Sequence, residues 1–148
     1  MSDVSGEFLV QKSNYENQLV FGWANISMGV DGSEIVDHHG DVIAPDDLEL
    51  AAYEFVLHER ASGEDHSGDS PSGMLVESMF FDAAKIRALA TDPFSGDYNE
   101  DVAITLSKTI PTGWWVGFHI PDRVSFERAI DNKTMFSIEG SAVREKAA

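Results

Sequence analysis

The alternation of apolar and polar residues predicts a chain made mainly of strands, because side chains on a strand point alternately to its two faces. We expect strands at residues 7–12, 18–28, 73–81, 114–120 and 134–140, with a further short one at 102–106. Gly22, inside the second of these, predicts a bulge or a bend. The clearest pattern puts four residues on one core face: Trp114, Val116, Phe118 and Ile120.

Three segments have helical spacing instead. The first follows Pro45 and runs to about Arg60, with Asp46 as the expected N-cap and Glu49 three residues later. Its core face is Leu48, Ala51, Ala52, Phe55 and Val56. The second is capped by Asp82 and points Ile86 and Leu89 inward; the third starts at Pro121-Asp122 and ends at 131–133. The apolar residues of the third helix are Val124, Phe126, Ala129 and Ile130.

Strands of unequal length with three helices between them predict an α+β domain built round an antiparallel sheet or barrel. The 148 residues, 43% of them apolar, fit one domain, residues 1–148, with a substantial core. We expect 1–6 and 145–148 to be loosely ordered at its ends. The polar stretches 62–72 and 91–99 are expected to be weakly ordered loops.

The chain is strongly acidic, with a net charge of −16. The electrostatic field of this negative charge repels phosphate backbones, which argues against nucleic-acid binding. It suits either solubility or a basic protein partner, of which solubility is the commoner use. No apolar run has the length of a membrane span and no secretory signal begins the chain, which predicts a soluble intracellular protein without membrane attachment. The absence of cysteine excludes thiolate chemistry.

The strand at 134–140 carries one hydroxyl of interest, Ser137. If Thr134, Phe136 and Ile138 form the core face, Ser137 stands on the other face beside Glu139. Ser137 is then either a serine nucleophile or an ordinary hydroxyl on the solvent side of a strand.

A serine nucleophile needs a base, and the chain has five histidines. His58 and His119 fall on the polar sides of their elements, which favours a solvated or structural role. His66 lies in a glycine-rich loop directly before a strand, where an imidazole can be presented to a cleft. The alternative for His66 is an exposed loop histidine.

The run Asp37-His38-His39-Gly40-Asp41 offers a different chemistry. Asp37, His39 and Asp41, together with His66, are a conceivable ligand set for a divalent metal. No second ligand pair at fixed spacing supports it, so a tight turn held by the two aspartates is the preferred interpretation and no metal or other cofactor is expected.

Several short pieces, taken in order, resemble the XkdF-like family of phage serine proteases, a branch of the prohead maturation proteases. They are Phe21–Ala24, Val36–Ile43, Ala51–Phe55, the histidine loop followed by Leu75–Ser78, Gly113–Phe118 and Met135–Gly140. The resemblance covers roughly residues 19–144, nearly the whole chain.

The resemblance implies a fold like that of the herpesvirus assemblin proteases, a small antiparallel barrel surrounded by helices. It also implies a serine endopeptidase that cleaves scaffold and major capsid proteins inside the assembling prohead, in the host cytoplasm. By position, His66 matches the base of the family and Ser137 its nucleophile.

The resemblance leaves the third catalytic residue open. Three carboxylates are candidates: Glu77 on the strand after His66, Glu64 two residues before it, and Glu139 beside the serine. We favour Glu77, because a neighbouring strand holds a carboxylate rigidly against an imidazole. Arg144 is the candidate contributor to an oxyanion site.

Two other functions are also compatible with these residues. One is a catalytically silent assembly module that binds scaffold or capsid protein, as a monomer or a homodimer. The other is a metal-dependent hydrolase that uses Asp37, His39, Asp41 and His66.

Overall fold

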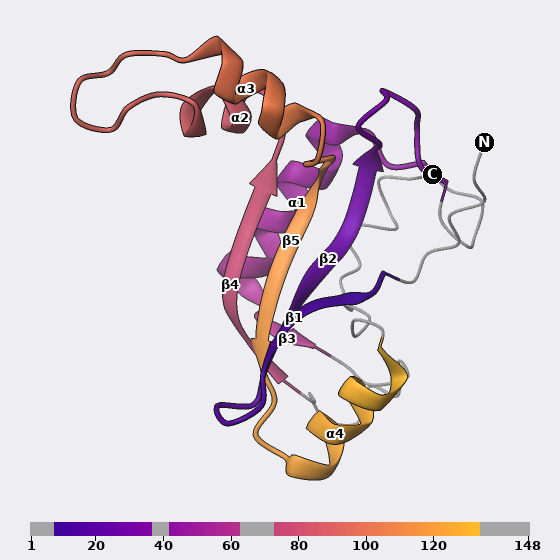
Figure 1. Ribbon diagram of the computed structural model, residues 1–148. Coiled ribbons are helices and arrows are strands. Elements are labelled where there is room, and N and C mark those ends of the chain that lie inside the picture. Colours follow the sequence, from indigo (N-terminus) through magenta and orange to yellow (C-terminus); the bar gives the residue numbers. More distant parts are fainter. Residues whose placement is uncertain (1–7, 37–41, 63–72, 134–148) are drawn as a thin grey trace.

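The computed structural model describes residues 8–36, 42–62 and 73–133. In this part of the chain a twisted antiparallel sheet has helices against one face and at both of its ends (Figure 1). The strands are β1 (Val10–Asn14), β2 (Leu19–Met28), β3 (Ala61–Ser62), β4 (Gly73–Phe81) and β5 (Thr112–His119). The helices are α1 (Pro45–His58), α2 (Ala83–Leu89), α3 (Glu100–Ser107) and α4 (Arg123–Asn132). The predicted α+β class is confirmed.

The sheet has five strands in the order β1-β2-β5-β4-β3, all antiparallel to their neighbours. Within the described residues it is open, with β1 at one edge and the two-residue β3 at the other. The predicted barrel is therefore not closed by these residues. The bend expected at Gly22 is displaced: the register shifts at Gln11, opposite Gly22 on β1, and again at Ala24 and Ser27.

The core lies between the sheet and α1, as the strand pattern predicts. Trp114, Val116, Phe118 and Ile120 are all buried, and Trp114 and Phe118 make edge-to-face contacts with Phe55 of α1. The helix contributes four buried residues: Leu48, Ala51, Ala52 and Phe55. Burial of these side chains supplies the main driving force for this packing.

The predicted N-cap of α1 is wrong by two residues. The cap is Ala44, which provides no side-chain hydrogen bond, and Pro45 occupies the first helical turn. Proline suits that position because its fixed φ fits the helix. It lacks an N–H, but an N–H in the first turn would have no acceptor within the helix. Asp46 and Asp47 lie in the first turn, where their negative charges interact favourably with the positive end of the helix dipole.

The region after β4 differs most from expectation. Residues 102–106 form part of the helix α3 rather than a strand, because the Asn99 side chain accepts a hydrogen bond from Val102 N and caps a helix there. A small separate core is formed by Ile86 of α2, Ala90 at the C-cap of α2 and Ala103 of α3. Leu89, expected to face inward, is half exposed.

The loop at 91–99 is a defined turn rather than a weakly ordered segment. The Asp92 carboxylate accepts hydrogen bonds from the backbone N–H groups of Phe94 and Ser95, which lowers the pKa of Asp92. Thr91 also pairs with Tyr98 across the loop. Together with α2 and α3, this loop extends from one end of the sheet (Figure 1).

At the other end of the sheet, α4 packs under the β1–β2 hairpin (Figure 1). The helix starts where predicted, and Asp122 caps it by accepting a hydrogen bond from Ser125 N, which lowers the pKa of Asp122. Phe126 is fully buried and meets Tyr15 edge to face, whereas Val124, another apolar residue of this helix, is exposed. The helix ends at Lys133 in the left-handed region, and Lys133 O accepts a hydrogen bond from Val10 N.

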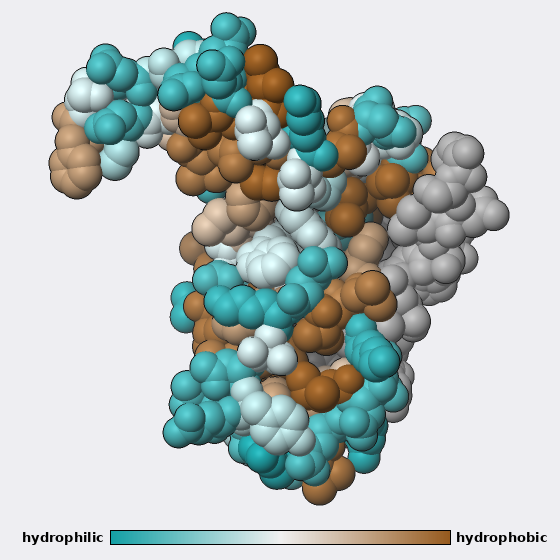
Figure 2. All heavy atoms as spheres, viewed as in Figure 1, coloured by the Kyte–Doolittle hydropathy of each residue, from teal (hydrophilic) through white to brown (hydrophobic). Residues whose placement is uncertain are grey.

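None of the described helices covers the second face of the three central strands, β2, β5 and β4 (Figures 1 and 2). Trp23, Trp115 and Phe81 form an aromatic cluster there, with Trp23 edge to face against both partners. Phe21 on the same face has the Lys12 ammonium 4.3 Å above its ring. None of the described helices is long and apolar enough to cross a membrane.

Gly117 is required by the close approach of β2 to β5. A Cβ at this position would lie 2.4 Å from Phe21 Cδ2 and 3.2 Å from Glu77 Cβ. Replacing Gly117 by alanine is expected to lower the free energy of unfolding by about 1–3 kcal/mol, through overpacking. Alanine is otherwise the better strand residue, so a loss of stability isolates the contact.

Urea denaturation of Gly117→Ala against wild type measures this effect. Ser13→Ala, on an exposed position of β1, serves as the control and is expected to stay within about 0.5 kcal/mol of wild type. An unchanged midpoint for Gly117→Ala would contradict the packing at Phe21.

Candidate active site and substrate groove

Most residues predicted to carry chemistry lie outside the described part of the chain. These are Ser137, His66 and Arg144, the alternative carboxylates Glu64 and Glu139, and the proposed metal ligands Asp37, His39 and Asp41. Their assignments therefore stay predictions. Among the described residues no group of three or more His, Asp or Glu is arranged to hold a metal ion.

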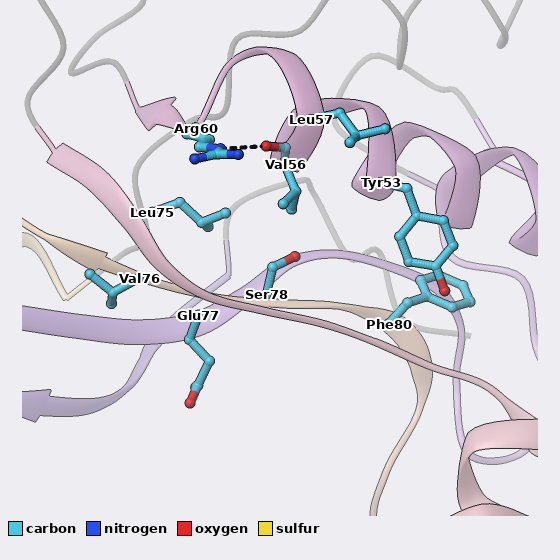
Figure 3. Close-up of a pocket in the computed structure, with 9 residues that line it drawn as sticks. All are labelled: Tyr53, Val56, Leu57, Arg60, Leu75, Val76, Glu77, Ser78 and Phe80. Atoms are coloured by element: carbon cyan, nitrogen blue, oxygen red, sulfur yellow. Dashed lines mark hydrogen bonds between the residues drawn. The ribbon is translucent and has the colours of Figure 1, made fainter.

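Glu77, the favoured third catalytic residue, is described and lies on β4 as predicted. Its side chain points away from α1, to the opposite face of the sheet (Figure 3). There Oε1 accepts a hydrogen bond of 2.9 Å from Trp115 Nε1. Its Cβ packs against Gly117 on the neighbouring strand. The carboxylate is thus exposed but held in place, with Oε2 unpaired among the described residues.

Two other histidines are in the positions expected of them. His58 is on the exposed side of α1, where its Nε2 lies 3.1 Å from a carboxylate oxygen of Glu54, one turn earlier. His119 Nδ1 lies 3.1 Å from the carbonyl oxygen of Asn17 in the β1–β2 hairpin. Neither histidine forms a hydrogen bond with a serine hydroxyl of the described chain, as expected of solvated or structural histidines.

An open groove of about 560 Å³ lies between α1 and β4 on the other face of the sheet. Its wall is mainly apolar: Val56 and Leu57 from the helix and Leu75, Val76 and Phe80 from the strand (Figure 3). Leu57 is 65% exposed and Val76 is 54% exposed, so both present apolar surface to solvent.

The two ends of the groove carry opposite charge. At the Phe80 end, Tyr53 Oη donates a hydrogen bond of 2.8 Å to Glu49, which raises the pKa of the tyrosine; partial burial and the charges of Glu49 and Asp82 add to the shift. At the Leu75 end stands Arg60, whose Nε donates to Val56 O. Its other guanidinium N–H groups have no carboxylate partner within the described chain.

Ser78 is the aliphatic hydroxyl of the groove lining, and it serves a structural role. Its Oγ accepts a hydrogen bond of 2.9 Å from Nε1 of Trp114, an indole that is 2% exposed. No described histidine lies against this hydroxyl to act as its base. We therefore do not consider Ser78 a nucleophile.

Sequence patterns did not lead us to this groove, although one signal was present. Leu50, Tyr53 and Leu57 repeat at i, i+3 and i+7 and are all exposed, forming a second apolar stripe beside the core face of α1. An amphipathic helix of a monomer rarely needs a second stripe, so the excess indicates a surface that binds something.

The Ser78 hydrogen bond makes a prediction. Ser78→Ala leaves a buried indole N–H without a partner, which is expected to lower the free energy of unfolding by about 1–3 kcal/mol. Urea denaturation followed by tryptophan fluorescence measures the loss, and Ser78→Thr, which keeps the hydroxyl, is the matched control. Activity per folded molecule should persist in Ser78→Ala; its complete loss would make Ser78 the nucleophile after all.

Comparison with known proteins agrees with the resemblance found in the sequence. A family model described as "Putative phage serine protease XkdF" matches residues 7–145, which is nearly the entire chain. No curated protein and no solved structure matches significantly. The matched region contains all the helices and strands described above, together with the stretches that hold His66 and Ser137. The chain belongs to the XkdF family of phage serine proteases.

Proposed function

We propose that the protein is a serine endopeptidase that cleaves scaffold and major capsid proteins during assembly of the phage head, within the prohead in the host cytoplasm. The observation that carries this proposal is the family match over residues 7–145. The acidic surface and the apolar groove are compatible with polypeptide substrates, and the reaction needs no cofactor.

In the proposed mechanism His66 takes the proton of Ser137 as its oxygen attacks the peptide carbonyl. Backbone amides, aided by Arg144, stabilise the oxyanion of the tetrahedral intermediate. His66 then gives the proton to the leaving amine, and water hydrolyses the acyl-enzyme by the same route in reverse. Glu77 orients the imidazole and stabilises its charged form.

The distance between Lys133 and Gly73, the described residues nearest in sequence to Ser137 and His66, is compatible with a pairing of these two side chains. Lys133 is hydrogen-bonded to Val10 on β1, and Val10 lies opposite Gly22 on β2. Gly22 lies opposite Val116 on β5, which lies opposite Ser78 on β4. These four steps between neighbouring chain segments separate Lys133 from Ser78 by about 19 Å across the sheet. Gly73, at the start of β4, is displaced along the strands by a further distance of about 13 Å.

The straight-line separation of the two anchors, Lys133 and Gly73, is thus about 23 Å. Ser137 follows Lys133 by four residues and His66 precedes Gly73 by seven. At about 3.3 Å per residue these tethers can span about 36 Å together, so the connecting segments are long enough for the two side chains to meet.

The same anchor supports the finer proposal for the fold. Because Lys133 O accepts a hydrogen bond from Val10 N, Lys133 lies beside β1, at the edge of the sheet. We propose that residues 134–140 add to that edge and continue the sheet toward a herpesvirus protease-like barrel.

Ser137 provides the decisive test of the chemistry. Ser137→Ala is expected to reduce cleavage of co-expressed scaffold protein by about 10⁴-fold or more, with an unchanged thermal midpoint, because the hydroxyl is the attacking group. His66→Ala should cause a loss of similar size, and the double variant should be no worse than either single one. Gel analysis of the scaffold protein measures the result; cleavage by Ser137→Ala at the wild-type rate would refute the assignment.

Glu77 can be tested separately from its structural bond. Glu77→Gln keeps an oxygen that accepts the Trp115 N–H but removes the negative charge, so stability is expected to stay within about 0.5 kcal/mol of wild type. If the charge supports His66, kcat should fall by about 10²-fold or more with little change in KM. Equal activity of Glu77→Gln and wild type would rule out Glu77 as the third catalytic residue and leave Glu64 and Glu139 as the candidates.

The exposed apolar groove favours one alternative, a catalytically silent module that binds scaffold or capsid protein. The two functions differ in a simple way, because the silent module binds its partner and leaves it intact. Absence of cleavage by the folded wild-type protein, with binding retained, would favour the module.

A further inference from the structure

We infer that the groove between α1 and β4 binds an extended polypeptide as an additional strand on the edge of β4. The inferred segment has a bulky apolar side chain at its centre, basic residues before it and acidic residues after it. This inference rests on the proposed function, since it identifies the bound segment as the substrate region of the protease.

The first argument is the incomplete pairing of β4. On the side away from β5, β3 pairs only with Gly73 and Met74, and Leu75 N donates to Arg60 O. From Val76 to Phe81 no described strand pairs with that side of β4. An unpaired strand edge presents N–H and C=O groups that an extended peptide can satisfy, which is the basis of binding by strand addition.

The second argument is the apolar cavity directly beside this edge. Side chains of an added strand would alternate between the two faces of the sheet. Those on the α1 face would enter the space lined by Val56, Leu57 and Phe80 (Figure 3). A cavity of about 560 Å³ accommodates a large aliphatic or aromatic side chain.

The third argument is charge, which sets the direction and the flanking residues. Antiparallel pairing is the commoner arrangement, and it makes the peptide run from the Phe80 end of β4 toward the Leu75 end. Its N-terminal part then meets the carboxylates of Glu49 and Asp82, and its C-terminal part meets Arg60. Basic residues before the apolar side chain and acidic residues after it complement these groups.

The exposed apolar residues give a selective way to damage the groove. Leu57→Glu places a carboxylate in the cavity at a position that is 65% exposed, so folding is expected to be unaffected. Val124→Glu is the matched control, because Val124 is also on a helix and 61% exposed but lies on α4, away from the groove.

The test measures binding in a Ser137→Ala background, so that it does not depend on cleavage. The probe is a fluorescein-labelled peptide of twelve residues with two lysines before a central phenylalanine and two glutamates after it, and fluorescence anisotropy follows its binding. We expect Leu57→Glu to weaken binding by about 30-fold or more and Val124→Glu to leave it unchanged. A peptide with lysines and glutamates exchanged should bind less tightly than the first.

Backbone pairing is tested by N-methylating the probe at single positions. Strand addition predicts a loss of binding at every second residue, since alternate N–H groups face β4. Uniform effects, equal binding by Leu57→Glu and Val124→Glu, or no binding of the probe would each overturn the inference.

Two other occupants give distinct results that would also overturn it. If a second copy fills the groove, sedimentation would show a dimer that Leu57→Glu dissociates. If a segment of the chain itself fills it, the amides of Val76 to Phe81 would resist hydrogen exchange without peptide, and the probe would add no protection. Failure of the proposed catalytic function would be seen in a separate experiment, in which scaffold protein incubated with the wild-type protein stays intact. That outcome would not affect the interpretation of the peptide-binding measurement.

Discussion

The close contact between β5 and β2 is the constraint on which the remaining structure depends. At Gly113 an added Cβ would come within 2.6 Å of Asn25 O, and at Gly117 within 2.4 Å of the Phe21 ring. Because neither glycine has a side chain, β2 can pair closely with β5 while Trp114, Val116 and Phe118 point into the core. One face of the strand thereby builds the core and the other leaves room for aromatic rings. β5 pairs with β4 as well, so the groove, Glu77 and the anchor at Val10 all take their positions from this strand.

The sequence predicted those elements whose signal is carried by their own residues. The alternating run at 114–120 and the helix repeat at 48–55 bury large side chains, and both are confirmed. Asp82 was recognised as a cap, and the start of a helix at Pro121-Asp122 was recognised, because an aspartate before a helical repeat has few other uses. Residues 102–106 were mistaken for a strand, since Val, Ile and Thr have strand propensity that the Asn99 cap and the contact with α2 override.

Features that depend on distant parts of the chain could not be predicted in this way. The groove requires α1 to lie beside β4, and β3 to begin only at Ala61, opposite Met74, so that Val76 to Phe81 have no described strand on that side. Neither fact is encoded in a local pattern, although the exposed stripe Leu50, Tyr53 and Leu57 was visible in the sequence. The hydrogen bond of Glu77 to Trp115 is of the same kind, because it joins residues 38 positions apart through strand register.

The position of Glu77 is consistent with both the proposed chemistry and the inferred groove, even though the carboxylate and the apolar cavity lie on opposite faces of β4. A polypeptide added to the edge of this strand would lie about 4.8 Å from it and expose its side chains to both faces. Side chains on one face would fill the cavity under α1, and those on the other would pass close to Glu77. An edge strand is therefore the one place in a sheet where a single bound segment can meet both surfaces. The proposed catalytic carboxylate and the inferred binding groove need not share a face, provided that the substrate binds as a strand.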